Sequence, residues 1–154
     1  MQRFIRLIKN TLTPIKEKMP WDAEEALKNN KNLLIIDVRE QEEYEAMHIE
    51  GSILVPRGIL ESACEWDFEE TIAELVKARE REIMVVCRSG YRSLLGVHSM
   101  QVLGYKNAFS LKTGLRGWND FELPLIDHSN QTLDMEIADD YFTTKLRSDQ
   151  KHPL

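Results

Sequence analysis

The sequence predicts an α/β fold in which helices cover both faces of a parallel sheet. The continuous apolar run at residues 33–36 has the pattern of a strand that is buried on both faces, and further strands are predicted for the apolar run at 83–86 and for residues 108–111. Helical patterns lie between these runs, and the connections are short. Strands that alternate with helices in this way are typical of a parallel sheet.

Composition is consistent with this fold and excludes several classes of protein. A chain of 154 residues with 42% hydrophobic and 30% charged residues is typical of one globular domain. The net charge of -6 argues against a general nucleic-acid binder. Two distant cysteines and four scattered histidines provide neither a disulfide framework nor a zinc motif, so we expect no metal. No apolar run is long enough to span a membrane, and no signal peptide is evident.

The N-terminal segment is basic and amphipathic. Five cations accompany a single acid, Glu17, within residues 1–18: Arg3, Arg6, Lys9, Lys16 and Lys18. Apolar residues recur at helical spacing at Phe4, Leu7, Ile8, Leu12 and Ile15. Pro14 is expected to end or kink this helix. We expect the segment to pack on its own domain or to fray; docking on an anionic membrane or a partner is the alternative.

The next elements lead to a charged strand end. Asp22 is predicted to cap a helix that reaches Asn29. The strand at residues 33–36 then ends at Asp37 and Arg39, at the sheet edge where open α/β folds build their sites. A helix at residues 41–47 follows, with its glutamates, including Glu43, on a solvated face, and residues 52–55 form another apolar run.

The remaining elements follow from capping and terminating residues. A second capping-box pattern at residues 67–70 predicts a helix with Phe68, Ile72, Leu75 and Val76 on one face. The helix after the central loop stops at Gly104, and a turn at Thr113 enters a short helix that Pro124 terminates.

Cys87 is the strongest candidate for chemistry. It follows the strand at residues 83–86 and precedes an apolar-periodic helix, with Arg88, Gly90 and Arg92 close by. Backbone N–H groups and the positive end of a helix dipole converge at such a position, and with guanidinium charge they favour the nucleophilic thiolate. We therefore predict that Cys87 is a nucleophile. Because a reactive thiol is best kept reduced, the cytoplasm is the expected compartment.

Three ordered motifs resemble the signatures of the rhodanese domain family. The first motif consists of Asp37, Val38, Arg39, Glu40, Glu43, Tyr44, His48, Ile49, Gly51 and Pro56. Residues 87–93 resemble the active-site loop of the family, and Gly104, Tyr105, Gly114 and Trp118 resemble its second signature. One departure is Thr113, where many members have a glycine. The resemblance implies a parallel-sheet domain at residues 20–125, between a basic extension at 1–19 and a helical extension at 126–154.

This resemblance implies sulfur transfer without a metal or an organic cofactor. Rhodaneses take a sulfane sulfur from a small anionic donor such as thiosulfate onto the loop cysteine, which corresponds to Cys87. They pass the sulfur from this persulfide to cyanide, a thiol or a protein. The residues expected to bind the donor are Arg39, Arg88, Ser89, Gly90, Tyr91 and Arg92. Asp37 is expected to act as an internal anchor and His48 to make a structural hydrogen bond.

Loop length separates two chemistries that related folds support. Phosphatases that resemble rhodaneses have a Cys-x5-Arg loop, whereas Cys87 and Arg92 form a shorter Cys-x4-Arg loop. The shorter loop favours sulfur over phosphate, so we expect a sulfurtransferase or a persulfide carrier. The alternatives are a non-enzymatic interaction or sensor module and, less favoured, phosphatase or arsenate-reductase chemistry.

Two further features have open roles. Cys64 is expected to be a buried structural cysteine, and a resolving thiol near Cys87 is the alternative. A helical stripe in the tail consists of Met135, Ala138, Phe142 and Leu146. It is expected to pack on its own domain, and the alternative is a docking or homodimer helix. The physiological donor and acceptor do not follow from the sequence.

Overall fold

A computed structural model describes residues 3–11 and 14–153 of the chain. Five parallel strands form one sheet in the order β1-β5-β4-β2-β3. The predicted parallel α/β fold is confirmed. The strands are β1 (Glu17–Lys18), β2 (Leu34–Asp37), β3 (Ile53–Leu54), β4 (Ile83–Val86) and β5 (Ala108–Leu111).

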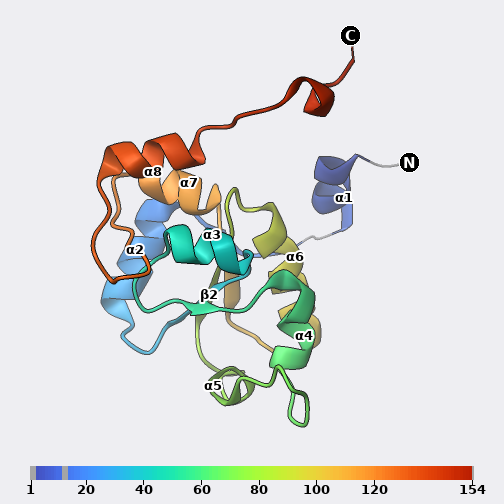
Figure 1. Cartoon of the computed structure of the whole chain (residues 1–154). Helices are drawn as coiled ribbons and strands as arrows, with labels where there is room; N and C mark the ends of the chain where they lie inside the picture. Colours follow the sequence, from blue (N-terminus) through green and yellow to red (C-terminus); the bar gives the residue numbers. More distant parts are fainter. Residues whose placement is uncertain (1–2, 12–13, 154) are drawn as a thin grey trace.

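Helices cover both faces of this sheet (Figure 1). The α-helices are α1 (Phe4–Thr11), α2 (Pro20–Asn29), α3 (Gln41–Ala46), α4 (Leu60–Ala63), α5 (Ala73–Val76), α6 (Tyr91–Val102), α7 (Gly114–Asp120) and α8 (Met135–Phe142). Two 3-10 turns occur at Arg57–Ile59 (η1) and Ser148–Gln150 (η2). None of the helices in the described residues has the length and apolar character of a membrane span.

Two apolar cores explain why the central strands have no polar face. Residues of β2, β4 and β5 are buried throughout. Alternate strand residues, such as Ile83 and Val85, pack under α4, α5 and α6, while Met84 and Val86 pack under α2, α7 and α8. Burial on both faces requires the continuous apolar runs seen in the sequence.

The N-terminal segment packs partly on the domain. α1 contacts α6, with Phe4 edge-to-face against Tyr91 at 5.9 Å and Ile8 buried, although half of the Phe4 surface stays exposed. Leu12 lies outside the described residues. Residues 17–18, within the expected N-terminal extension, form edge strand β1, which pairs with β5. A two-residue strand leaves no periodic pattern that the sequence could reveal.

Two helix predictions were wrong at their starts. α2 begins at Pro20 with Met19 as its N-cap, because proline is well suited to the first helical position; Asp22 lies in the first turn. The pattern at residues 67–70 opens no helix: Asp67 has a φ of 68°, and only Ala73–Val76 is helical. There the Thr71 hydroxyl donates to Glu65 O at 2.7 Å and turns the chain back, so Phe68 remains 55% exposed.

Candidate active site

Cys87 lies where β4 ends and the twelve-residue helix α6 begins. Gly90 is the N-cap of this helix and has a φ of 91°, a conformation that favours glycine. Its N–H donates to Cys87 Sγ at 3.1 Å. Cys87 is only 1% exposed. A backbone N–H donor and the N-terminus of α6 therefore surround its sulfur.

The carbonyl groups of this loop are held by α7. Leu115 N–H donates to Cys87 O at 2.8 Å, and Arg116 N–H donates to Arg88 O at 3.0 Å. Gly114 allows this approach because a Cβ there would lie 2.5 Å from the carbonyl carbon and oxygen of Arg88. The contacts turn both carbonyls toward α7 and fix the conformation of the loop around Sγ.

Thr113, the departure from the family pattern, adopts the conformation that a glycine would favour. Its φ is 68°, which costs about 1 kcal/mol or more for a branched residue. Its hydroxyl donates to Lys112 O, and a Cβ at Gly117 would collide with it. Because Gly117 has no side chain, there is room for the side chain of Thr113.

A chain of two serine hydroxyls extends from the sulfur into the protein. Ser93 Oγ lies 3.3 Å from Cys87 Sγ, and Ser110 Oγ lies 2.7 Å from Ser93 Oγ. Both serines are fully buried. We did not predict either as a site residue, although a serine in the otherwise apolar β5 is an unusual residue for a buried strand.

Arg92 is paired with a carboxylate next to the loop. Its two terminal nitrogens donate to the two oxygens of Glu43 on α3, each at 2.8 Å. This pairing raises the pKa of Arg92. Partial burial opposes ionisation of Glu43, but hydrogen bonds from Arg92 and the Glu40 backbone outweigh it and lower the Glu43 pKa. The expectation that Glu43 lies on a solvated face was wrong, because it is half-buried under α6.

Arg88 is directed toward the C-terminal helix. Its guanidinium donates to Tyr141 O at 3.3 Å and Phe142 O at 3.1 Å, and it lies over both aromatic rings. Carbonyls at a helix C-terminus attract cations, which explains the pairing. In this arrangement Arg88 connects the loop to α8.

Asp37 and Arg39 form a fully buried ion pair at the end of β2. Arg39 Nη2 donates to Asp37 Oδ2 at 2.8 Å and to Met47 O at 2.6 Å, and Arg39 Nε donates to Asp37 Oδ1 at 3.0 Å. Arg39 Nη1 is the only buried side-chain nitrogen or oxygen without a hydrogen-bond partner in the described residues. One donor of this guanidinium is therefore uncommitted.

His48 contacts both helix α3 and the segment around Ile126. Its ring stacks on Tyr44 at 3.9 Å, and Nδ1 lies 2.8 Å from Tyr44 O. Its backbone exchanges hydrogen bonds with Ile126, each at 2.9 Å. The ring of His48 thus packs on α3, while its backbone holds the segment at Ile126 against the domain.

A groove with a volume of 460 Å³ borders the loop at Ser89, Gly90 and Tyr91. Its other walls are Ile8 and Lys9 of α1, Glu17 of β1, Leu94 of α6, and Lys112 and Thr113 after β5. The N-terminal helix therefore contributes to a cavity at the edge of the Cys87 loop.

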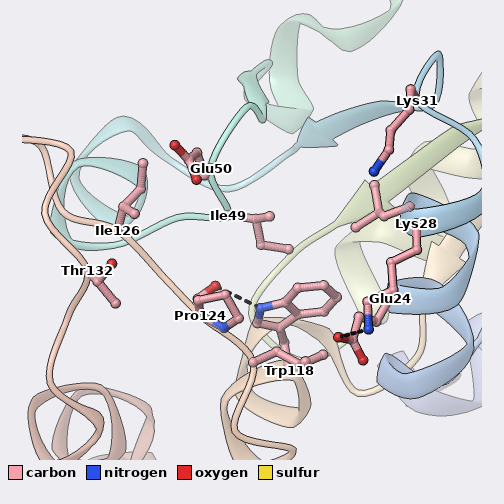
Figure 2. A pocket seen from close by; sticks show the side chains of 11 residues that line it. Glu24, Lys28, Lys31, Ile49, Glu50, Trp118, Pro124, Ile126 and Thr132 are labelled. Atoms are coloured by element: carbon pink, nitrogen blue, oxygen red, sulfur yellow. Dashed lines mark hydrogen bonds and ion pairs between the residues drawn. The ribbon is translucent and has the colours of Figure 1, made fainter.

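A second pocket, of 270 Å³, lies between α2 and the segment after α7. Figure 2 shows the Trp118 indole in this pocket, where Nε1 donates to Pro124 O at 3.0 Å beside the Glu24–Lys28 ion pair. None of the predicted site residues lines it. No group of three or more histidine, cysteine, aspartate or glutamate side chains in residues 3–11 and 14–153 could hold a metal ion.

Cys64 lies at the end of α4 and is fully buried. Burial raises the pKa of its thiol, and the Tyr105 phenol and Arg79 only partly oppose this rise. Such surroundings are typical of a structural cysteine.

Comparison with known proteins places these features in a family. The family model for the rhodanese-like domain matches residues 21–121, so the chain belongs to this family. YrkF of Bacillus subtilis, named as a candidate sulfur carrier protein, is 34% identical over 90 residues. That match covers 58% of this chain and 43% of YrkF, so the chain spans less than half of this relative.

Solved structures share the fold. The human single-domain sulfurtransferase TSTD1 is 25% identical with a TM-score of 0.58, and the match covers 70% of this chain and 96% of that one. A Rhodopseudomonas palustris protein described as a possible tyrosine phosphatase is 22% identical with a TM-score of 0.72, covering 80% and 94%. The second likeness shows the fold alone.

Proposed function

We propose that this protein is a sulfurtransferase or sulfur carrier whose working intermediate is a persulfide on Cys87. The observation that carries the proposal is the hydrogen bond from Gly90 N–H to Cys87 Sγ inside a six-residue Cys-x4-Arg loop. This donor and the helix N-terminus stabilise anionic sulfur. The names of YrkF and the human sulfurtransferase support the same chemistry.

The reaction has two half-reactions. In the first, the Cys87 thiolate attacks the sulfane sulfur of a donor such as thiosulfate, and sulfite leaves with the electron pair of the broken S–S bond. In the second, a nucleophile such as cyanide, a thiol or a protein cysteine attacks the terminal sulfur of the persulfide. Cys87 then leaves as a thiolate, and the loop donor stabilises the charge that returns to it.

Three arginines are proposed to attract the anionic donor. Arg92 lies close enough to the sulfur for their charges to interact, and Arg39 has one uncommitted donor. Arg88 would have to leave its carbonyl partners on α8 before it could bind a donor directly. Ser89 and Tyr91 border the groove through which substrates are proposed to reach the loop.

No observation favours the alternatives over sulfur transfer. A phosphatase would require a loop that surrounds a tetrahedral phosphate, and the Cys-x4-Arg spacing is one residue shorter than the phosphatase loop. A module that only binds partners would have no use for a thiol that accepts a backbone hydrogen bond.

Sulfur loading tests the proposal directly. The protein is incubated with thiosulfate and its intact mass is measured for one added sulfur atom, which cyanide should then remove. We expect the adduct on the wild type and on Cys64→Ser, and its absence on Cys87→Ser. The Cys64→Ser variant is the matched control because it changes the other cysteine by the same atom.

Two results would contradict the proposal. One is the absence of an adduct on folded wild-type protein with thiosulfate and with a persulfide donor. The other is hydrolysis of an aryl phosphate that depends on Cys87, which would favour phosphatase chemistry.

A further inference from the structure

Behind Cys87, the Ser93 hydroxyl of the loop motif is joined by the hydroxyl of Ser110, which neither the family motifs nor the packing of the core explains. Ser93 Oγ and Ser110 Oγ are 2.7 Å apart, and Ser93 Oγ is 3.3 Å from Sγ. Ser110 lies on β5, on the strand next to the one that precedes Cys87. A buried hydroxyl is costly unless it is hydrogen-bonded, and alanine would fill the same place without that requirement.

The direction of this hydroxyl chain can follow the charge on the sulfur. When Cys87 is a thiol, its S–H donates to Ser93 Oγ, and Ser93 donates to Ser110. When the sulfur is a thiolate, Ser93 rotates its O–H toward Sγ, and Ser110 donates to Ser93 Oγ in turn. Each hydroxyl has one donor and two acceptor sites, so the chain can run in either direction without movement of the backbone.

We propose that Ser110 is a positioning residue that acts through Ser93 to stabilise the Cys87 thiolate as it leaves the persulfide. This inference rests on the proposed function for its second half-reaction, in which an acceptor attacks the terminal sulfur and the S–S electron pair returns to Sγ. Ser93 contacts the reacting atom, and Ser110 aligns and polarises the Ser93 hydroxyl.

Charged groups also lie around the loop and Arg92, so the hydroxyl effect must be separated from theirs. They lie on four elements: Arg88 in the loop, Arg92 on α6, Glu43 on α3, and Asp37 and Arg39 at the end of β2. None of these side chains hydrogen-bonds to either serine in the described part of the chain. A change at Ser110 therefore leaves these ion pairs in place.

The test compares Ser110→Ala, which removes the hydroxyl, with Ser110→Thr, which keeps it. The first measurement is the rate of iodoacetamide alkylation of Cys87 against pH, which reports the thiolate without any sulfur transfer. We expect Ser110→Ala to move the profile to higher pH and to slow alkylation at neutral pH about 3- to 10-fold, because Ser93 loses the partner that polarises its hydrogen bond to the thiolate. Ser110→Thr should retain the wild-type profile.

The second measurement is a single turnover from the sulfur-loaded protein to excess thiol. We expect Ser110→Ala to slow this release about 3- to 10-fold, whereas loading at a pH above the thiol pKa changes little. Unchanged alkylation and unchanged release in a folded Ser110→Ala variant would overturn the inference, as would an effect that Ser110→Thr reproduces. If the alkylation profile shifts but wild type accepts no sulfur, the proposed function fails while the thiolate effect of Ser110 stands.

Discussion

Cys64 and Cys87 are equally buried but differ in what surrounds the sulfur. Both belong to the apolar core under α4, α5 and α6, and their exposed fractions are 0% and 1%. Burial raises the pKa of Cys64. Cys87 has a backbone N–H at 3.1 Å, a hydroxyl at 3.3 Å and a nearby guanidinium from Arg92.

The comparison shows that burial does not distinguish a structural cysteine from a nucleophile in this fold. The two cysteines differ in the elements that they follow. Cys87 follows β4, where a helix N-terminus meets the sheet, whereas Cys64 follows the single turn of α4. Donors directed at the sulfur, rather than access to it, distinguish Cys87, the proposed nucleophile, from Cys64.

The largest expected effect is a difference in alkylation rate between the two cysteines. In native protein at neutral pH, we expect iodoacetamide to modify Cys87 at least about 100-fold faster than Cys64, because donors around Cys87 favour its thiolate whereas burial disfavours the thiolate of Cys64. Peptide mapping after timed quenching measures both rates in one sample. Equal rates, or faster modification of Cys64, would contradict the expected difference between the two cysteines.

The next largest effect is expected from Gly114→Ala. The new Cβ would lie 2.5 Å from Arg88 O, so the loop must shift away from α7. We expect a loss of about 2–4 kcal/mol in the free energy of unfolding and at least about 10-fold slower alkylation of Cys87, from backbone strain and loop displacement. Urea denaturation and the alkylation assay check this result.

Gly51→Ala is the matched control for backbone strain. Gly51 has a φ of 80°, but no atom lies within 4 Å of its would-be Cβ. Its variant should lose about 1 kcal/mol and keep the wild-type reactivity of Cys87. If Gly51→Ala and Gly114→Ala changed the reactivity of Cys87 equally, the close approach of α7 would not determine the conformation of the loop.

A smaller effect is expected from Glu43→Gln, which removes the partner of Arg92. Because the folded-state pKa of Glu43 lies below its ordinary value of 4.5, its ionised form stabilises the protein above that value. This stability is lost as the pH falls through the folded-state pKa. We expect Glu43→Gln to be less stable than wild type by about 1 kcal/mol at neutral pH, and the difference to shrink in acid.

Urea midpoints measured across this pH range test the Glu43 prediction. A difference that grows in acid would contradict the sign of the pKa shift. Release of Arg92 from Glu43 should also leave more positive charge near Cys87 and make its alkylation about 2-fold faster. The reactivity of Cys64 should stay unchanged, which extends the contrast between the two thiols.

The smallest effect on chemistry is expected from Cys64→Ala. Removal of a buried sulfur should cost about 1–2 kcal/mol through the cavity that it leaves. Sulfur loading of Cys87 should stay within about 2-fold of wild type, since Cys64 supplies no donor to the loop. A large loss of loading in stable Cys64→Ala protein would revive the resolving-thiol alternative.

Local patterns were sufficient to predict the framework that holds Cys87. The strands at residues 83–86 and 108–111 and the stop at Gly104 follow from apolar runs and from one glycine, which has a φ of 93°. These features depend on neighbours in the sequence. The apolar character of residues 33–36 also indicated that β2 is buried on both faces, which the structure shows.

Contacts between distant segments could not be predicted in the same way. Glu43 was assigned to solvent because its own helix is charged, yet its partner lies 49 residues away on α6. Ser110 is 17 residues from Ser93, and Arg88 is directed at carbonyls more than 50 residues along the chain. Their roles depend on which elements the sheet order brings together.

The attachment of Arg88 to α8 sets a limit on protein engineering with this chain. The family match ends at residue 121, but Ala138 and Phe142 of α8 share a core with Leu115 of α7. A chimaera built only from the matched segment would discard the helix that holds Arg88 and leave this core open. The Cys87 loop and α8 should therefore be transplanted together, as one cassette.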